Sequence, residues 1–234
     1  MKSLKGPEIP AASGKTKQLI VFLHGVGADG NDLISLADIF SEAFPNAHFC
    51  SPHAPFAFDM APPGFAAGYQ WFSLQEYMQQ SPEAVMKNRT TSRNLLAGAA
   101  EAAPYLNDFI DAKLKALGLD DSALILIGFS QGTMMALYTS LRRNKPCAAV
   151  IGYSGALLGA DVLAKEIVSR PPVCLIHGAV DMVVPHQMMR DAEAGLKANK
   201  VPVEAHTRPQ LAHGIDPEGV GIAIRFLVKH LQMA

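Results

Sequence analysis

Short, continuous apolar runs alternate along this chain with longer segments in which apolar residues recur at helical spacing. The continuous runs predict strands that are buried on both faces, and the periodic segments predict helices. The predicted strands are 18–23, 47–51, 123–128, 148–152, 173–177 and 202–207. The predicted helices are 31–43, 91–117, 131–143, 161–168, 186–199 and 216–231. This alternation predicts an α/β fold with a mostly parallel central sheet and helices on both faces.

Two segments depart from the alternation. Residues 1–17 are polar and contain glycine, proline and lysine, so we expect a loose N-terminal arm. Residues 52–87 are rich in proline and aromatic residues, which interrupt regular elements. A long aromatic loop inside a compact domain usually has a functional role. No repeat, low-complexity tract or linker divides residues 18–234, which we therefore predict to form a single domain.

The composition is that of a globular protein without affinity for polyanions. Apolar residues make up 49% of the chain, charged residues 18%, and the formal net charge is −1. A nucleic-acid or anionic-membrane partner would require a basic patch, so we expect neither. No apolar run reaches the ~18 residues that span a bilayer, and the start has no apolar core of a secretory signal. We expect a cytoplasmic protein whose cysteines, Cys50, Cys147 and Cys174, are buried reduced thiols.

The pentapeptide GFSQG, residues 128–132, matches the G-x-S-x-G pattern of serine hydrolases. The pattern alone is weak, but here it follows the predicted strand 123–128 and opens the predicted helix 131–143, as the motif requires. A serine on such a sharp turn needs neighbours without side chains two residues away. The start of a helix also favours developing negative charge. We therefore predict that Ser130 is a nucleophile rather than a helix cap.

A serine nucleophile needs a histidine base, and the base needs an acid that fixes its tautomer. In the α/β-hydrolase fold the acid and then the histidine follow the serine, on loops at the carboxyl ends of later strands. Asp181 meets this condition, because it comes just after the predicted strand 173–177. Asp161 begins a predicted helix and is expected to cap it. Asp191 lies within a predicted helix and is expected to face solvent.

Four histidines follow Asp181 and compete for the role of base. His230 ends the last predicted helix, far from the carboxyl edge of the sheet. His206 belongs to the polar face of the last predicted strand. His186 is too near Asp181 in sequence to come from the next loop. His213 lies between the last strand and the last helix, so we predict that it is the base.

A glycine-rich loop, HGVGADG at residues 24–30, follows the first predicted strand. In this fold one oxyanion donor is the N–H of the residue after the nucleophile, here Gln131, and the other comes from a loop after an earlier strand. The glycines let this loop approach Ser130, and we expect His24 to be structural. The spacing matches neither the P-loop nor G-x-G-x-x-G, which disfavours a nucleotide-binding protein.

Several motifs in this order resemble the phospholipase/carboxylesterase family of α/β-hydrolases, which includes the acyl-protein thioesterases. The motifs are LHGVGADG at 23–30, GFSQG at 128–132, HG at 177–178 with DMVVP at 181–185, and AHG at 212–214. In addition, QWF at 70–72 is similar to the family's Trp-Phe element near the acyl pocket, and YSGAL at 153–157 to its Ser-Gly-x-Leu loop. The resemblance extends from residue 16 to residue 231.

The resemblance implies a catalytic triad of Ser130, Asp181 and His213. It implies that the backbone N–H groups of Val26 and Gln131 form the oxyanion hole. It also implies a compact enzyme with little lid and no cofactor, and we expect no metal.

An apolar slot for the acyl chain should adjoin the serine. The candidate lining residues are Met60, Phe65, Trp71, Phe72, Leu157 and Val183, and each has ordinary core packing as its alternative. Two departures from the family concern this region and the base. The segment 52–87 is longer and richer in proline than in relatives, and Leu211-Ala212 precedes His213 where relatives often carry Gly-Met.

We therefore predict a serine carboxylic-ester hydrolase that acts on short to medium acyl esters through an acyl-enzyme. Thioesters and lysophospholipids are further candidate substrates, and the expected partner is a small-molecule acyl ester or thioester. The alternatives are a peptidase or amidase on the same scaffold, and a non-catalytic ligand-binding relative, which the intact triad disfavours. The sequence is compatible with a monomer or a homodimer.

Overall fold

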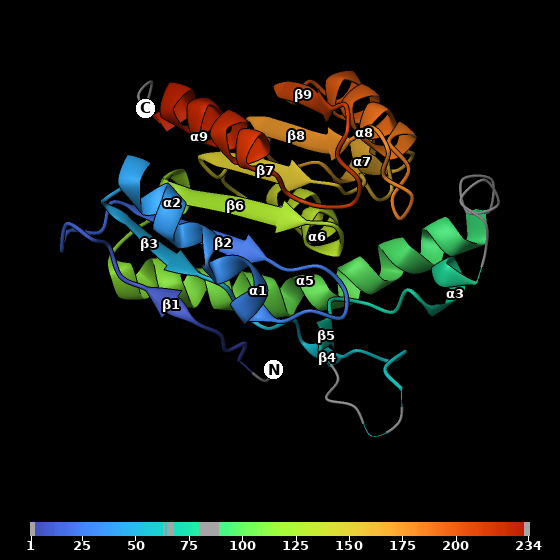
Figure 1. The fold of residues 1–234 in the computed structure, drawn as a ribbon, viewed down its shortest axis with the longest axis horizontal. Coiled ribbons are helices and arrows are strands. Elements are labelled where there is room, and N and C mark those ends of the chain that lie inside the picture. The colour runs from blue at the N-terminus through green and yellow to red at the C-terminus, as the bar shows by residue number, and fades with distance from the viewer. Residues whose placement is uncertain (1–2, 63, 65–67, 80–88, 232–234) are drawn as a thin grey trace.

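The computed structural model describes residues 3–62, 64, 68–79 and 89–231. Its main feature is a seven-stranded sheet with the strand order β1-β3-β2-β6-β7-β8-β9 (Figure 1). In that order the strands are Glu8–Ile9, Ala47–Cys50, Gln18–Leu23, Leu124–Phe129, Ala149–Tyr153, Val173–Gly178 and Val203–Arg208. β1 runs antiparallel to β3, and all other neighbours are parallel. The predicted mostly parallel sheet is confirmed.

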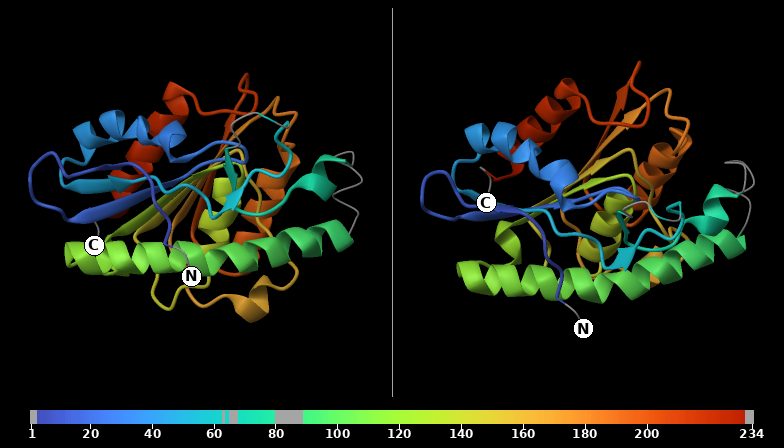
Figure 2. Two further views of the ribbon diagram at one scale, coloured as in Figure 1. Left: turned by 90° about the horizontal axis from the view of Figure 1, so that it is seen from below. Right: turned by 60° about the horizontal axis from the view of Figure 1, so that its bottom comes forward.

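Helices cover both faces of this sheet, because alternate residues of each strand point to opposite sides. On β2, Val21 belongs to one buried apolar cluster and Phe22 to the other. The first face is covered by α5 (Arg89–Leu117), α6 (Gln131–Ser140), α7 (Leu163–Glu166) and α8 (Gln187–Ala198). The second face is covered by α1 (Gly30–Ile34), α2 (Leu36–Ala43) and α9 (Pro217–Leu231), as Figure 2 shows.

The described part of the aromatic segment forms short elements beside the main sheet. β4 (Phe56–Ala57) pairs antiparallel with β5 (Tyr69–Gln70), and α3 (Gln75–Met78) follows. Two backbone hydrogen bonds tie β5 to the glycine-rich loop, since Gly27 N donates to Tyr69 O at 2.8 Å and Tyr69 N donates to Ala28 O at 2.7 Å. The predicted loop is therefore anchored to the region expected to hold the oxyanion.

Several predicted boundaries differ from the observed ones. The predicted helix 31–43 is two helices, which meet at Ser35. α5 begins before the predicted start and continues through Pro104, although proline removes a helix hydrogen bond. A short 3₁₀ helix, Asp121–Ala123, precedes β6. Within the arm predicted for residues 1–17, β1 pairs with β3 and Leu4 is buried, so the arm packs on the domain.

Parallel strands end at one edge of the sheet, and that edge gathers the predicted site. β2, β6, β7, β8 and β9 end there at Leu23, Phe129, Tyr153, Gly178 and Arg208. The loops that follow these strands carry every residue predicted to act in catalysis or to hold the oxyanion. Among the described helices, none is both long and apolar enough to cross a bilayer.

Candidate active site

Ser130 occupies a strained turn between β6 and α6. Its φ is 54° and its ψ is −117°, a conformation that a residue with a side chain adopts at a cost of about 1–3 kcal/mol. A Cβ added at Gly132 would lie 1.8 Å from the Leu23 carbonyl oxygen, and one at Gly128 would lie 2.4 Å from the Gly132 carbonyl. Both glycines of the motif are thus required sterically, as the sequence predicts. Ser130 N donates to Tyr153 O at 2.9 Å, which fixes the turn against β7.

Asp181 and His213 are joined by a hydrogen bond at the same edge of the sheet. The distance between His213 Nδ1 and Asp181 Oδ2 is 2.7 Å, and the aspartate side chain is fully buried. Asp181 Oδ1 accepts from Val183 N at 2.8 Å and from Val184 N at 2.9 Å. The loop after β8 is therefore folded around the carboxylate.

The hydrogen bonds keep this carboxylate ionised. Burial alone would raise the pKa of Asp181, but hydrogen bonds from His177, His213 and the two loop amides outweigh burial and hold the pKa well below its usual range. A carboxylate can only accept, so His213 Nδ1 carries the proton and its Nε2 is left as the basic nitrogen.

The His213 ring lies beside the residue that precedes the serine. The centroids of the Phe129 and His213 rings are 4.8 Å apart with an interplanar angle of 44°. Within the described ranges, no hydrogen bond joins Ser130 Oγ to His213. Such bonds are often long in unliganded hydrolases and shorten when substrate is bound.

His177 is a fourth polar residue of this cluster, and its sequence context predicts no catalytic role. It is buried at the end of β8, and its Nε2 lies 2.8 Å from Val184 O and 3.2 Å from Asp181 Oδ2. Both neighbours are acceptors, so Nε2 carries the proton. The sequence feature that could have indicated such a role is the dipeptide His177-Gly178, because His177 comes four residues before the acid Asp181. However, His177 is also the last residue of the predicted apolar strand 173–177, where a polar residue is ordinary.

The competing residues have other partners. His186 hydrogen-bonds Thr207 and Arg190, and His206 lies near Glu204. The His230 ring packs on Phe226 at the end of α9. Asp191 accepts from Gln187 within α8, and Asp161 is exposed. None of these side chains lies in the cluster around Asp181 in the described structure, apart from the edge contact of the His186 ring with His177.

The two predicted oxyanion donors, the backbone N–H groups of Val26 and Gln131, lie close to Ser130. Gln131 is the first residue of α6, where a backbone N–H has no acceptor within the helix. A Cβ added at Gly25 would lie 3.4 Å from Ser130 Cβ, so the Gly25–Val26 peptide passes close to the nucleophile. In the part of the chain that the structure describes, the Val26 N–H has no hydrogen-bond acceptor.

The residues proposed to line the substrate pocket occupy different environments. Trp71 is fully buried in the core, whereas Phe72, which is also buried there, lines a cavity as well. Met60 and Leu157 are partly buried against that core. Val183 is half-exposed next to Asp181, and Phe65 lies outside the described residues.

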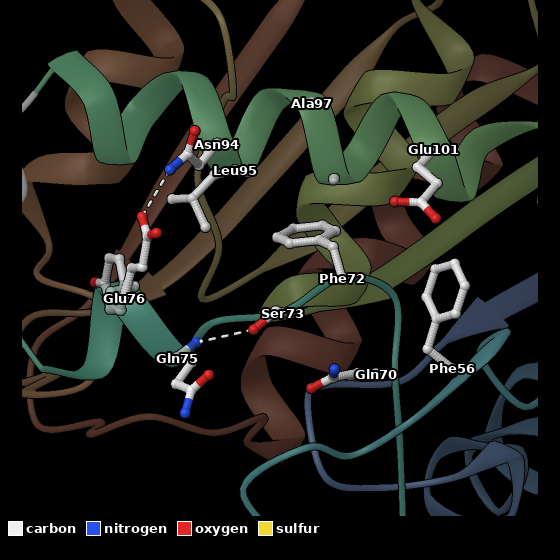
Figure 3. A pocket seen from close by; sticks show the side chains of 12 residues that line it. Phe56, Gln70, Phe72, Ser73, Gln75, Glu76, Asn94, Leu95, Ala97 and Glu101 are labelled. Carbon is white, nitrogen blue, oxygen red and sulfur yellow. Dashed lines mark hydrogen bonds between the residues drawn. The ribbon is translucent and has the colours of Figure 1, made fainter.

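A cavity of about 620 Å³ lies between α5 and the segment that follows β5 (Figure 3). Its walls include Phe72 and Ser73 on one side and Leu95 and Glu101 on the other. The Asn94 amide donates to a Glu76 carboxylate oxygen at 2.7 Å within it. The lining contains no residue of the Ser130–Asp181–His213 set, so this cavity is not the immediate site of the acyl carbon.

One cluster has the residue types of a metal site. Ligand atoms of Glu8, His48 and Cys50 lie within 4.8 Å of one another at the outer edge of the sheet. The Lys113 ammonium pairs with the Glu8 carboxylate. Burial raises the pKa of the Cys50 thiol to about 12, so the thiolate that a metal needs is disfavoured. The cluster is therefore explained by ion pairing between β1, β3 and α5.

A strained serine between a strand and a helix, with a buried Asp–His pair at the same edge of a parallel sheet, defines a serine hydrolase of the α/β-hydrolase fold. The chain belongs to the phospholipase/carboxylesterase family, whose sequence model matches residues 4–231. The resemblance seen in the sequence motifs is confirmed.

Relatives of this chain are named as thioesterases and esterases, which are serine hydrolase activities of the kind this site suggests. Acyl-protein thioesterase 1 of Emericella nidulans is 26% identical over 95% of this chain and 94% of its own. Acyl-protein thioesterase 1 of Schizosaccharomyces pombe is 29% identical over 81% of this chain and 80% of its own. Among solved structures, esterase PE8 has 38% sequence identity and a TM-score of 0.88, covering 98% of this chain and 100% of that chain.

Proposed function

We propose that this protein hydrolyses acyl esters and thioesters with Ser130 as nucleophile, His213 as base and Asp181 as the acid that orients the base. Membership of the phospholipase/carboxylesterase family makes the protein a hydrolase of ester bonds. The observation that supports these residue roles best is the 2.7 Å hydrogen bond between His213 and the buried Asp181, at the strand edge that carries Ser130. It orients the imidazole and leaves Nε2 free to accept a proton.

In the proposed reaction His213 Nε2 takes the hydroxyl proton of Ser130 as Oγ bonds to the acyl carbon. The carbonyl π electrons move to oxygen, and the N–H groups of Val26 and Gln131 stabilise this oxyanion. When the oxyanion collapses, the C–O or C–S bond breaks and the leaving alcohol or thiol takes the proton from His213. Water then attacks the acyl carbon as His213 Nε2 takes its proton. The bond between the acyl carbon and Ser130 Oγ breaks, Oγ takes the proton back from His213, and the carboxylic acid is released.

We extend the proposal to substrates with short and medium acyl chains. Thioesters are included because the relatives from Emericella nidulans and Schizosaccharomyces pombe are named acyl-protein thioesterases. The half-exposed Val183 beside Asp181 and the partly buried Met60 and Leu157 are described apolar candidates for acyl contact. We also propose a cytoplasmic location, which suits the buried free thiols of Cys50, Cys147 and Cys174.

Replacing the nucleophile tests the proposal directly. We expect Ser130→Ala to lower kcat for p-nitrophenyl butyrate by about 10⁶, because knocking out a triad serine removes the whole covalent route. A fluorophosphonate probe should label Ser130 in the wild-type protein and leave the variant unlabelled. Ser41→Ala, on the exposed side of α2, is the matched control and should retain full activity.

The same experiment separates the alternatives. Activity of Ser130→Ala within tenfold of wild type would refute the proposal. Cleavage of p-nitroanilides at rates comparable to esters would indicate a peptidase or amidase. Absence of both turnover and labelling in folded wild-type protein would indicate a ligand-binding relative. An acyl-chain series of matched oxyesters and thioesters then defines the preferred substrate class.

A further inference from the structure

The side chain of Gln131 makes two buried hydrogen bonds to a segment distant in sequence. Its Oε1 accepts from Trp71 N at 2.8 Å, and its Nε2 donates to Phe72 O at 2.7 Å. The side chain is fully buried. A carboxamide has an acceptor oxygen and a donor NH₂ group, so it can bind both the N–H and the C=O of this segment, as a neighbouring strand would.

Trp71 continues this connection to the glycine-rich loop. Its indole Nε1 donates to His24 O at 3.1 Å, and its ring lies 5.8 Å from the His24 ring between centroids. Trp71 therefore contacts the residue after the nucleophile through its backbone, and the loop that carries Val26 through its side chain.

His24 transmits this contact to the peptide that carries the Val26 N–H. Ala54 N donates to His24 Nε2 at 3.0 Å, so Nε2 is unprotonated and Nδ1 donates to Gly25 O at 2.7 Å. Burial lowers the pKa of His24, which favours this neutral form. Gly25 O and Val26 N belong to one trans peptide group, whose C=O and N–H point in opposite directions. Holding Gly25 O therefore sets the direction of the Val26 N–H.

We infer that His24, Trp71 and Gln131 form an oxyanion brace, in which Gln131 and Trp71 are positioning residues that fix the spacing and direction of the two oxyanion donors. The inference rests on the proposed function, because it assigns the Val26 and Gln131 amides to the oxyanion. It also assigns Trp71 a role other than contact with the acyl chain. Oxyanion donors work by being aligned before the charge develops, so small displacements are expected to reduce kcat.

Two substitutions test the brace while leaving both backbone donors in place. Gln131→Met removes both side-chain hydrogen bonds, and Trp71→Phe removes the indole donor to His24 O together with part of the buried ring. We expect kcat for p-nitrophenyl butyrate to fall about 10²-fold in Gln131→Met and about tenfold in Trp71→Phe, with KM within about threefold of wild type. Inhibition by a trifluoromethyl ketone, which forms a tetrahedral adduct with the serine, should weaken in parallel with kcat.

Thr139→Val is the matched control, because Thr139 is a buried residue of α6 whose hydroxyl has no hydrogen-bond partner among the described residues. It should leave kcat and ketone affinity unchanged. Activities are normalised to the fraction of Ser130 labelled by a fluorophosphonate, so that loss of folded protein is not counted as loss of catalysis. If Gln131→Met does not fold, Trp71→Phe carries the test by itself, since it keeps the Trp71 N–H and Phe72 C=O groups that Gln131 binds.

The outcomes separate the brace from the proposed function. The brace would be overturned if Trp71→Phe, and Gln131→Met where it folds, were less stable to heat but kept a kcat per labelled serine within threefold of wild type. A rise in KM with unchanged kcat in Trp71→Phe would overturn it in favour of substrate contact. A wild-type protein that neither hydrolyses esters nor reacts with fluorophosphonate would instead refute the proposed function.

Discussion

The two sides of the site are built from different interactions. On the side of the base, the end of β8 and the loops after β8 and β9 bring together a carboxylate and two imidazoles. The surrounding surface is open, since Met182, next to the acid, is 86% exposed. On the oxyanion side, His24, Trp71 and Gln131 are fully buried and joined by neutral hydrogen bonds. A base must exchange protons with the leaving group and with water, which enter and leave the site. An oxyanion hole works best when its donors do not move.

The two sides also differ in charge. Asp181 is the one buried carboxylate among the described residues. Its charge lies where an imidazolium forms during the reaction. The oxyanion side holds a neutral histidine and two neutral side chains, so no buried negative charge of the brace opposes the developing oxyanion. This arrangement predicts large effects of substitution on the charged side and smaller, kcat-specific effects on the neutral side.

The largest effect after loss of the nucleophile is expected for Asp181→Asn. An asparagine can hold His213 in the wrong tautomer, and the equivalent change in another triad lowers kcat about 10⁴-fold. The depressed pKa of Asp181 means that its stabilising contribution is present above the unfolded-state pKa and is lost as pH falls. Acid unfolding of the variant should therefore depend less on pH than that of wild type.

Ester hydrolysis at about pH 7, and unfolding followed from about pH 5 down to about pH 1, where an aspartate with a depressed pKa loses its stabilising contribution, would check both expectations. Asp191→Asn, an exposed residue of α8, is the control and should behave as wild type. A loss of less than tenfold in Asp181→Asn would remove the contrast between the two sides.

A smaller effect is expected for His177, which shares Asp181 Oδ2 with His213. His177→Phe removes a donor to an ionised carboxylate, an interaction of about 1.5–3 kcal/mol, and we expect kcat/KM to fall about tenfold or more. His177→Gln keeps an amide donor and should recover part of the loss. Equal activity of the two variants would show that His177 fills space without orienting the acid.

The smallest effect is expected for Ser154, which follows β7 and has a φ of 48°. Its Oγ donates to Gly214 O at 3.4 Å, next to the base. Ser154→Ala and Ser154→Gly both lose this bond and should lower kcat by about threefold or less, since a long neutral hydrogen bond contributes little. Only glycine relieves the positive φ, so Ser154→Gly should unfold with a free energy about 1 kcal/mol above that of Ser154→Ala. Denaturant titration measures this difference, and equal stabilities would contradict it.

The candidate triad could be predicted from the sequence because its signals are local. Ser130 lies in a motif between a strand and a helix, and Asp181 and His213 follow later strands in the required order. His177 was missed because its position is also typical of the end of an apolar strand. An aromatic side chain that lines a slot and one that fills a core have the same sequence pattern, so only the structure shows that Trp71 is fully buried and that Phe72 lines a cavity.

The sequence by itself determined the alternation of strands and helices, the glycines around Ser130 and the order of the candidate residues, because these depend on periodicity and on steric limits among near neighbours. The tertiary structure decided the pairing of His213 with Asp181, the donor from His177 and the burial of Trp71 against His24 and Gln131. Apart from the contact between His177 and Asp181, these contacts join residues far apart in sequence. They therefore form only when the sheet has brought its strand ends to one edge and the core has closed around the aromatic segment.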